Sequence, residues 1–166
     1  MLLFETPIGT CGVSWSELGI TGVALPRERA LSRSGVEPSS PEWVRTAIAD
    51  MVSLLEGGCP DLRSLVLDER GLDEFRRRVY AATREIGPGT TATYGEIARA
   101  IGDPGAARAV GAALAQNPFP IIVPCHRVLA ASGALHGFSA PGGIATKRRM
   151  LEIERAPGFT QPALFA

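Results

Sequence analysis

The stretch Ile-Ile-Val-Pro-Cys-His-Arg-Val, residues 121–128, organises the whole chain. Its apolar, β-branched start indicates a backbone that runs inward, and Pro124 fixes φ and removes one N–H. A thiol, an imidazole and a guanidinium follow. Cys125 is a candidate nucleophile, because a neighbouring base or helix N-terminus can lower the pKa of a thiol. In an extended segment successive side chains point to opposite faces, so we expect a water relay or a bent backbone between His126 and Cys125.

The residues before this stretch predict a series of short helices. The first carries an apolar stripe at helical spacing and ends at residues 87–89, Gly-Pro-Gly. The stripe consists of Phe75, Val79, Ala82 and Ile86. Thr93 and Glu96 have the spacing of a capping box, which predicts the start of a second helix that Gly102 ends.

A third helix over residues 106–115, capped by Asp103 and stopped at Asn117, completes a helix-turn-helix pattern with the second. Apart from Arg108, every residue in it is Ala, Gly, Val or Leu. A helix that reads base edges usually presents several polar side chains. Small residues that permit close approach, together with one long cation, instead favour minor-groove binding with an inserted side chain.

After the central stretch, an expected loop over residues 133–143 leads to a last helix over residues 144–154. We expect three consecutive cations on exposed faces of this helix: Lys147, Arg148 and Arg149. Its apolar residues are available for packing. Residues 156–166 contain two prolines and show no periodicity, which predicts a loosely packed tail.

The N-terminal part of the chain predicts a sheet and one helix. Turn residues divide residues 2–25 into a three-stranded antiparallel meander. Ser40 is expected to cap the helix, with Pro41 in its first turn and glycines at 57–58 as its stop. Residues 64–67 predict a short strand that could join the meander.

These elements predict an α+β protein with two domains. Residues 1–70 form a small α/β domain with the three-stranded antiparallel sheet and a linker. Residues 71–166 form a mostly helical domain with the helix-turn-helix.

Composition excludes several classes of protein. The 166-residue chain is 45% hydrophobic and 20% charged, as in an ordinary globular protein. No run approaches the ~18 apolar residues of a membrane span, and the apolar start is too short for a signal-peptide core. Three widely spaced cysteines, an odd number, favour a reducing compartment over a disulfide framework, so we expect a cytoplasmic protein.

The formal net charge is zero, but the charge is unevenly distributed. Residues 1–70 hold 6 basic and 10 acidic residues, whereas residues 71–166 hold 11 and 7. The basic half carries Cys125, which is a modest pointer to a nucleic-acid partner. A solvated basic face explains the asymmetry equally well.

The residues Pro-Cys-His-Arg-Val, 124–128, resemble the active-site motif of the O6-alkylguanine-DNA alkyltransferases, or methylated-DNA–protein-cysteine methyltransferases. The resemblance extends from about Phe75 to Glu154, with several motifs in the same order and spacing, and more weakly over the N-terminal part. It implies a DNA repair protein that moves the alkyl group of O6-alkylguanine onto its own cysteine. The competing interpretation of Cys125 is a small buried hydrophobe, the commonest state of a free cysteine.

The resemblance implies four catalytic positions. Cys125 corresponds to the acceptor nucleophile, and His126 to the base that removes its proton through water. Glu154 corresponds to the carboxylate that orients and charges the imidazole, as in other thiol triads. Asn117 corresponds to the asparagine that braces the turn between recognition helix and active-site strand, although an ordinary helix stop also fits its Asn-Pro context.

The resemblance also implies contacts to DNA and to the damaged base. Arg108 corresponds to the finger that enters the base stack, and Tyr94 to the tyrosine that assists rotation and hydrogen-bonds the guanine. The backbones at Val128 and Ser139 correspond to groups that read the guanine edge. Two further candidate contacts are Leu114 and Phe138. Base flipping is physically required, because the O6 substituent lies inside the duplex, where no thiol can reach it.

Two features depart from the usual family pattern. Phe138 occupies a position that is tyrosine in many relatives, and Ala140-Pro141 are two extra residues before Gly142-Gly143. Both departures fall in the loop that is expected to line the base pocket.

The implied reaction is an in-line displacement that ends in a thioether, so one protein would repair one base. We expect no metal and no cofactor. Some relatives carry a zinc ion in the N-terminal domain, but Cys11 and Cys59 have no histidine partner in the first 70 residues. The expected partner is double-stranded DNA containing O6-alkylguanine, which a monomer of the protein binds through the minor groove. We expect no interaction with a membrane.

Three other functions compete with repair. A protein that binds alkylated bases without repairing them would lack the cysteine, which is present here. A DNA-binding regulator would need base-reading side chains, which the third helix lacks. A cysteine hydrolase would need an oxyanion hole, and nothing in the sequence points to one.

Overall fold

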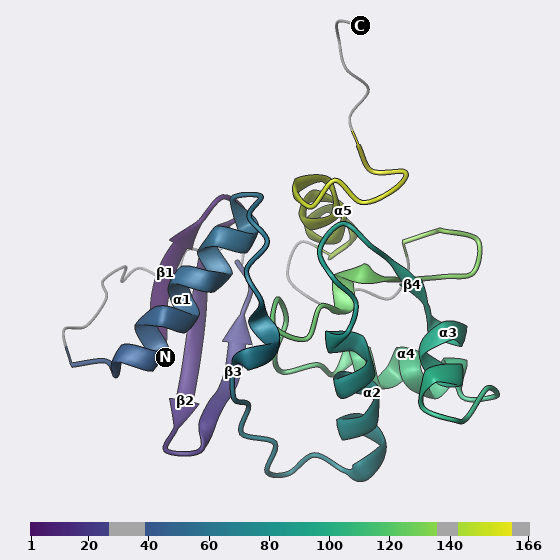
Figure 1. Ribbon diagram of the computed structural model, residues 1–166, viewed down its shortest axis with the longest axis horizontal. Coiled ribbons are helices and arrows are strands. Elements are labelled where there is room, and N and C mark those ends of the chain that lie inside the picture. The colour runs from purple at the N-terminus through teal and green to yellow at the C-terminus, as the bar shows by residue number, and fades with distance from the viewer. Residues whose placement is uncertain (27–38, 136–142, 161–166) are drawn as a thin grey trace, which may run out of the picture.

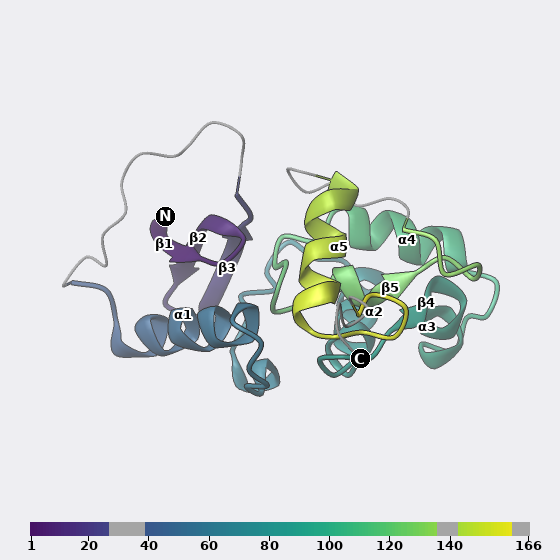
Figure 2. The same cartoon turned by 90° about the horizontal axis from the view of Figure 1, so that it is seen from above.

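The computed structural model describes residues 1–26, 39–135 and 143–160. Its N-terminal part is a three-stranded antiparallel sheet in the order β1-β2-β3, with one helix packed on one face (Figures 1 and 2). The strands are β1 (Leu2–Thr6), β2 (Gly9–Ser16) and β3 (Gly19–Ala24). The helix, α1 (Glu42–Leu55), buries its apolar stripe against the sheet. This arrangement confirms the predicted meander. The helix cap lies one residue later than expected, at Pro41, where no side chain can cap.

The strand predicted over residues 64–67 is wrong. The side chain of Asp61 accepts from the amide of Arg63 and starts a single 3₁₀ turn, η1 (Leu62–Ser64). The chain then touches the sheet at one parallel bridge between Ile20 and Leu67. Close approach is possible because Gly19 has a positive φ of 147° and no Cβ, which would lie 2.6 Å from the carbonyl oxygen of residue 66.

The C-terminal part is helical, as predicted. Its helices are α2 (Glu74–Arg84), α3 (Tyr94–Ala100), α4 (Ala107–Ala115) and α5 (Gly143–Ile153). Helices α3 and α4 pack against each other as the predicted helix-turn-helix. Asp103 does not cap α4 with its side chain, because its carbonyl closes a turn with the amide of Ala106, which then precedes the helix.

Two very short strands connect this helix-turn-helix to the Cys125 region. Strand β4 (Ala92–Thr93) pairs in parallel with β5 (Val128–Leu129). Thr93 is also the N-cap of α3: its hydroxyl accepts from the amide of Glu96 at 3.1 Å, and the Glu96 carboxylate accepts from the amide of Thr93 at 2.7 Å. The predicted capping box is therefore confirmed, and it fixes the start of α3 beside β5.

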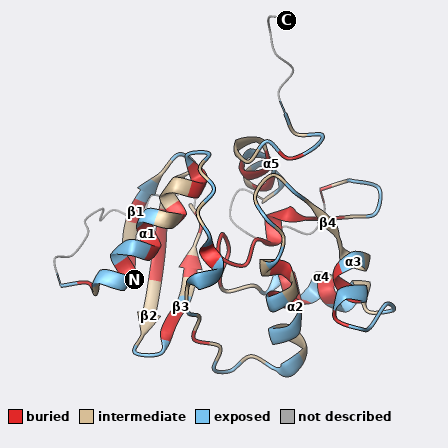
Figure 3. Cartoon of the chain, viewed as in Figure 1, coloured by how far each residue is buried: buried red, intermediate tan, exposed pale blue. Residues whose placement is uncertain are grey.

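Buried residues concentrate at three places: the inner face of the sheet, α1, and the segment that leads to β5 (Figure 3). One hydrophobic cluster contains residues from the sheet, from α1 and from helices α2 to α4. A smaller cluster lies under α5, and its buried members are Leu129, Leu135, Leu151 and Ala156. The α+β fold class predicted from the sequence is thus confirmed. Within the described residues, no helix is long and apolar enough to span a membrane.

The capping box predicts a measurable stability loss. Replacing Thr93→Ala removes the cap of α3 and should lower the free energy of unfolding by ~1 kcal/mol, the usual cost of losing such a cap. Urea denaturation followed by circular dichroism would measure it. Thr46→Ala, at an exposed position inside α1, is the matched control and should be neutral or slightly stabilising. Equal effects of the two substitutions would contradict the role of the cap.

Candidate active site

Cys125 lies in a short 3₁₀ turn, η2 (Cys125–Arg127), so the backbone is bent here and not extended. The amide of Cys125 donates to the carbonyl of Val123 at 2.7 Å, and the amide of Arg127 donates to that of Pro124 at 2.9 Å. Cys125 is 9% exposed, and His126 is fully buried. The thiol therefore lies just under the surface, with the imidazole behind it.

The turn that leads to Cys125 contains a strained residue. Ile121 has a φ of 75°, a left-handed conformation that a β-branched residue rarely adopts. The side chain of Asn117 braces the turn: Nδ2 donates to the carbonyl of Val123 at 2.9 Å, and Oδ1 accepts from the amide of Phe119 at 2.9 Å. Strain of this kind persists only where the surroundings over-determine it, and here the Asn117 bonds and the burial of Ile121 do so.

The carboxylate of Glu154, one residue beyond α5, holds the polar side of the site together. Its Oε1 lies 2.7 Å from Nε2 of His126. Arg127 donates from Nε to Oε2 at 2.9 Å and from Nη2 to Oε1 at 2.8 Å. Burial by itself would raise the pKa of Glu154, but His126 and Arg127 hold it at about 2. The carboxylate is therefore ionised at neutral pH, with only 3% of its side chain exposed.

This carboxylate fixes the tautomer of His126. An ionised carboxylate can only accept, so Nε2 must carry the proton that points to Glu154. Burial lowers the pKa of His126, although Glu154 opposes the effect, so the ring is neutral at neutral pH. Its second nitrogen, Nδ1, then has a free lone pair, and it is buried without a hydrogen-bond partner among the described residues. A neutral imidazole backed by a carboxylate is suited to general-base work.

The thiol of Cys125 would need such a base in order to react at neutral pH. Burial raises its pKa, and a hydrogen bond from Asn117 and the positive charge of Lys147 oppose this only in part. The sulfur is consequently protonated at neutral pH. It becomes a good nucleophile only when its proton is removed.

The structure brings some of the predicted DNA contacts close to this site. Tyr94, half-buried at the start of α3, lies against α4, where a Cβ at Gly111 would be 3.8 Å from its ring. Arg108 is exposed on α4. Val128 is buried at the start of β5, directly after η2, which we call the thiol turn because it carries Cys125. Leu114, in contrast, packs in the core, and its contact with DNA stays a prediction.

Phe138, Ser139 and the extra Ala140-Pro141 lie outside the described residues. Within the described part of the chain, no three His, Cys, Asp or Glu side chains gather in a group that could hold a metal ion.

Two residues of the site were missed by sequence reasoning. Arg127 was read only as part of a motif, although a guanidinium inside an apolar run signals a buried ion pair. Lys147 was expected on an exposed face, but it is buried and donates from Nζ to the carbonyl of Val128 at 2.7 Å. The available signal was its helical spacing from Met150 and Leu151, which are both buried.

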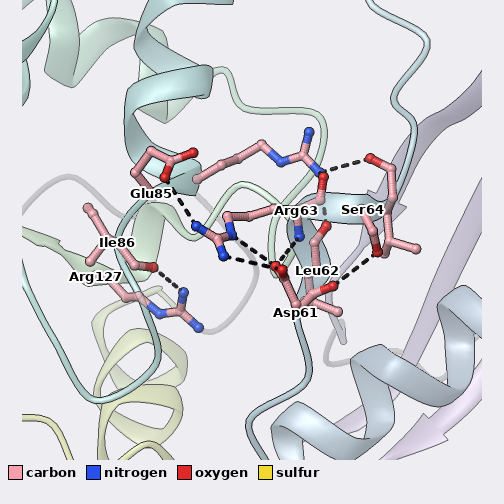
Figure 4. A network of polar contacts seen from close by, with 9 residues as sticks. Asp61, Leu62, Arg63, Ser64, Glu85, Ile86 and Arg127 are labelled. Atoms are coloured by element: carbon pink, nitrogen blue, oxygen red, sulfur yellow. Dashed lines mark hydrogen bonds and ion pairs between the residues drawn. The ribbon is translucent and has the colours of Figure 1, made fainter.

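A polar network connects this site to the N-terminal part of the chain (Figure 4). Arg127 uses its remaining nitrogen, Nη1, to donate to the carbonyl of Ile86, just after α2, at 2.6 Å. Nearby, Arg63 of η1 pairs with Asp61 at 2.9 Å and with Glu85 at 3.2 Å. A cavity of about 250 Å³ lies between these groups. The residues just after α2 therefore support both the turn that carries Cys125 and η1.

Comparison with known proteins gives a consistent result. A family model described as "6-O-methylguanine DNA methyltransferase, DNA binding domain" matches residues 74–156. The methylated-DNA–protein-cysteine methyltransferase of Mycolicibacterium paratuberculosis is 44% identical over 167 residues, covering 97% of this chain and 95% of that protein. The protein of the same description from Mycobacterium tuberculosis is 42% identical over 149 residues, covering 87% and 88%.

A solved structure shows the same fold. Mycobacterium tuberculosis OGT in complex with DNA superposes with a TM-score of 0.75 at 36% identity, covering 95% of this chain and 94% of that one.

The buried carboxylate predicts a pH-dependent stability. Because the pKa of Glu154 is lowered in the folded protein, its stabilising contribution is present above its ordinary value of about 4.5 and is lost as the pH falls toward about 2. Glu154→Gln should therefore lower the melting temperature most at neutral pH, and the gap to the wild type should narrow on acidification. Glu152→Gln, on α5, is the matched control with little expected effect. A gap that stays constant from pH 7 to pH 2.5 would contradict this role.

Proposed function

The chain belongs to the methylated-DNA–protein-cysteine methyltransferase family, a family of DNA repair proteins, and we propose that the sulfur of Cys125 accepts the alkyl group of O6-alkylguanine. The protein binds DNA and repairs it by alkyl transfer to itself. The observation that carries the assignment of Cys125 is the arrangement behind it: a neutral, buried imidazole whose free Nδ1 lone pair is oriented by Glu154.

The proposed reaction moves one proton and one alkyl group. A water molecule relays the thiol proton of Cys125 to Nδ1 of His126, and the resulting imidazolium is stabilised by the Glu154 carboxylate. The sulfur then attacks the alkyl carbon in line: the S–C bond forms, the C–O6 bond breaks, and the electron pair leaves with guanine. Overall, the proton lost by the thiol is gained by guanine. Protein and DNA supply every group, so the proposal includes no metal and no cofactor.

DNA binding is assigned to the helix-turn-helix. The exposed face of α4 presents Ala109 and Ala112 beside Arg108, and small residues next to one long cation suit close approach in the minor groove. We propose that Arg108 enters the base stack when the damaged nucleotide rotates out. Tyr94 would assist this rotation and hydrogen-bond the guanine. Rotating a base out of the duplex costs a few kcal/mol, and the cost is lowest for a mispaired base. This difference contributes to selectivity for the lesion.

The remaining proposed contacts line the base pocket. The backbone of Val128 would read the guanine edge from beside the thiol turn. The backbone of Ser139 would do so as well, and Phe138 would offer its ring as an apolar wall for the base; both roles rest on the family resemblance. Leu114 would support the DNA-contacting helix from its inner side. Asn117 would keep the thiol turn in place while the base enters.

The proposal has consequences for the state of the protein. A thioether has no easy second displacement, so each molecule reacts once. The protein would act as a monomer in the cytoplasm, where reducing conditions keep the acceptor thiol free. Residues 71–166 would carry both DNA binding and the acceptor, and residues 1–70 would support them as a separate domain. A role in lesion binding without repair is not favoured, because the cysteine and its base are both present.

The acceptor assignment predicts a single covalent event. Incubation with a duplex containing O6-methylguanine should add one methyl group to the intact protein, located on Cys125 by peptide mapping, and the reaction should then stop. Cys125→Ser should abolish the mass gain, whereas Cys59→Ser, at an exposed cysteine, should react normally. Sustained turnover, or a methyl group on Cys11 or Cys59 alone, would sink the assignment.

The role of Arg108 predicts a difference between two substrates. Arg108→Ala should slow repair of duplex DNA by at least tenfold, but it should leave the reaction with free O6-benzylguanine nearly unchanged, because a free base needs no flipping. Single-turnover rates on both substrates would measure this. Arg149→Ala, which removes an exposed charge from α5, is the control. Equal slowing of both reactions by Arg108→Ala would refute the finger role.

A further inference from the structure

Lys147 breaks the pattern of the helix on which it lies. Helix α5 exposes Arg148 and Arg149 but buries Lys147, which is 1% exposed, together with Met150 and Leu151. This face of an amphipathic helix normally carries apolar residues. A buried ammonium group costs free energy that an apolar side chain of similar size would not, so the position calls for an explanation beyond packing.

The surroundings of the ammonium group are those of the active site. Nζ of Lys147 donates to the carbonyl of Val128 at 2.7 Å and lies 5.9 Å from the centre of the Tyr94 ring. Its charge also acts on the Cys125 sulfur, since each of the two groups shifts the pKa of the other. Burial lowers the pKa of Lys147 to about 8, and the amine is therefore still charged at neutral pH.

Among the residues that the structure describes, the other groups that act on the sulfur carry no net positive charge at neutral pH. Tyr80 from α2 and Tyr94 from α3 act on the same sulfur, and burial raises the pKa of both hydroxyls, so they stay neutral. His126 is neutral until it takes the thiol proton. Arg127, behind it, is compensated by Glu154. Lys147 thus supplies a positive charge from α5, and the same charge also lowers the pKa of His126.

We propose that Lys147 is a functional residue of the alkyl transfer: its ammonium group stabilises the negative charge that forms on the Cys125 sulfur, and its hydrogen bond fixes the Val128 carbonyl beside the incoming base. This role of Lys147 rests on the proposed function in one respect, that Cys125 is the alkyl acceptor. The charge acts when the proton has moved from sulfur to His126 and before the S–C bond forms. Lys147 itself gains and loses no atom, so it is a positioning and electrostatic residue.

The test compares variants that separate charge from packing. Lys147→Gln keeps a hydrogen-bond donor for Val128 but removes the charge, and Lys147→Met keeps only the length of the side chain. Arg149→Gln removes an exposed charge from the same helix and is the matched control. Two reactions are followed between pH 6.5 and pH 9.5: carboxamidomethylation of Cys125 by iodoacetamide, located by peptide mapping, and single-turnover benzyl transfer from free O6-benzylguanine. Circular dichroism verifies folding, and Lys147→Gln decides the outcome if Lys147→Met does not fold.

The expected result is a rate gap that depends on pH. Removing a nearby positive charge raises the pKa of a thiol, typically by about one unit or more, and so lowers the fraction of thiolate. The greater nucleophilicity of a more basic thiolate offsets part of the resulting loss of rate. Both Lys147 variants should therefore react roughly three- to tenfold more slowly than wild type at pH 7. The gap should close above about pH 8, where the wild-type amine loses its own charge. Arg149→Gln should match the wild type throughout.

Other outcomes are equally decisive. No gap at pH 7, or a gap of the same size at every pH, would overturn the electrostatic role and leave Lys147 as a packing residue. If wild-type protein gained no benzyl group on Cys125 while the iodoacetamide gap followed the expected pH profile, the proposed function would fail. The effect of Lys147 on the sulfur would nevertheless stand.

Discussion

The buried carboxylate of Glu154 is the group on which the arrangement of the site depends. It accepts from His126 and twice from Arg127, and Arg127 continues to the carbonyl of Ile86 after α2. One side chain thus ties the end of α5, the thiol turn and the end of α2 together. Ion pairs of this kind add little net stability compared with apolar packing, but removing one partner leaves a buried charge uncompensated and is costly. The carboxylate therefore fixes geometry more than it adds stability, and the proposed role of His126 as a general base requires fixed geometry.

Very short elements place the remaining groups around the sulfur. The two-residue pair of β4 and β5 aligns Thr93 with Leu129. Since Thr93 caps α3, the next residue, Tyr94, must start its helix beside the thiol turn. Lys147 reaches the same place from α5 through the carbonyl of Val128. The helix-turn-helix and the thiol turn are consequently held in one fixed relation, which the proposed in-line alkyl transfer requires.

The N-terminal part supports the site from behind. The amide of Val23, on the edge strand β3, donates to the carbonyl of Pro118 at 2.9 Å, within the turn that contains the strained Ile121. On the other side, one nitrogen of Arg84 donates to three carbonyls in and next to η1, those of Leu62, Arg63 and Leu65. Pairing the sheet edge with the active-site turn gives that edge a partner and gives the turn a fixed backbone. The N-terminal part can in this way affect the geometry of the thiol turn.

Local patterns in the sequence determined the elements that local physics controls. Periodicity gave the helices, the spacing of Thr93 and Glu96 gave the cap of α3, and turn residues gave the meander. The resemblance around Cys125 also singled out His126 and Glu154, which the structure brings into contact, and their catalytic roles stay predictions. Residues 64–67 were misread as a strand, because the Asp61 side chain competes for the backbone there and sequence periodicity does not detect such a bond. The bent backbone at Cys125, the strained φ of Ile121 and the burial of Lys147 were decided only by tertiary structure. The φ of Ile121 and the burial of Lys147 are locally unfavourable. The side chain of Asn117 compensates for the first by bracing the turn, and the carbonyl of Val128 compensates for the second by accepting from the ammonium group.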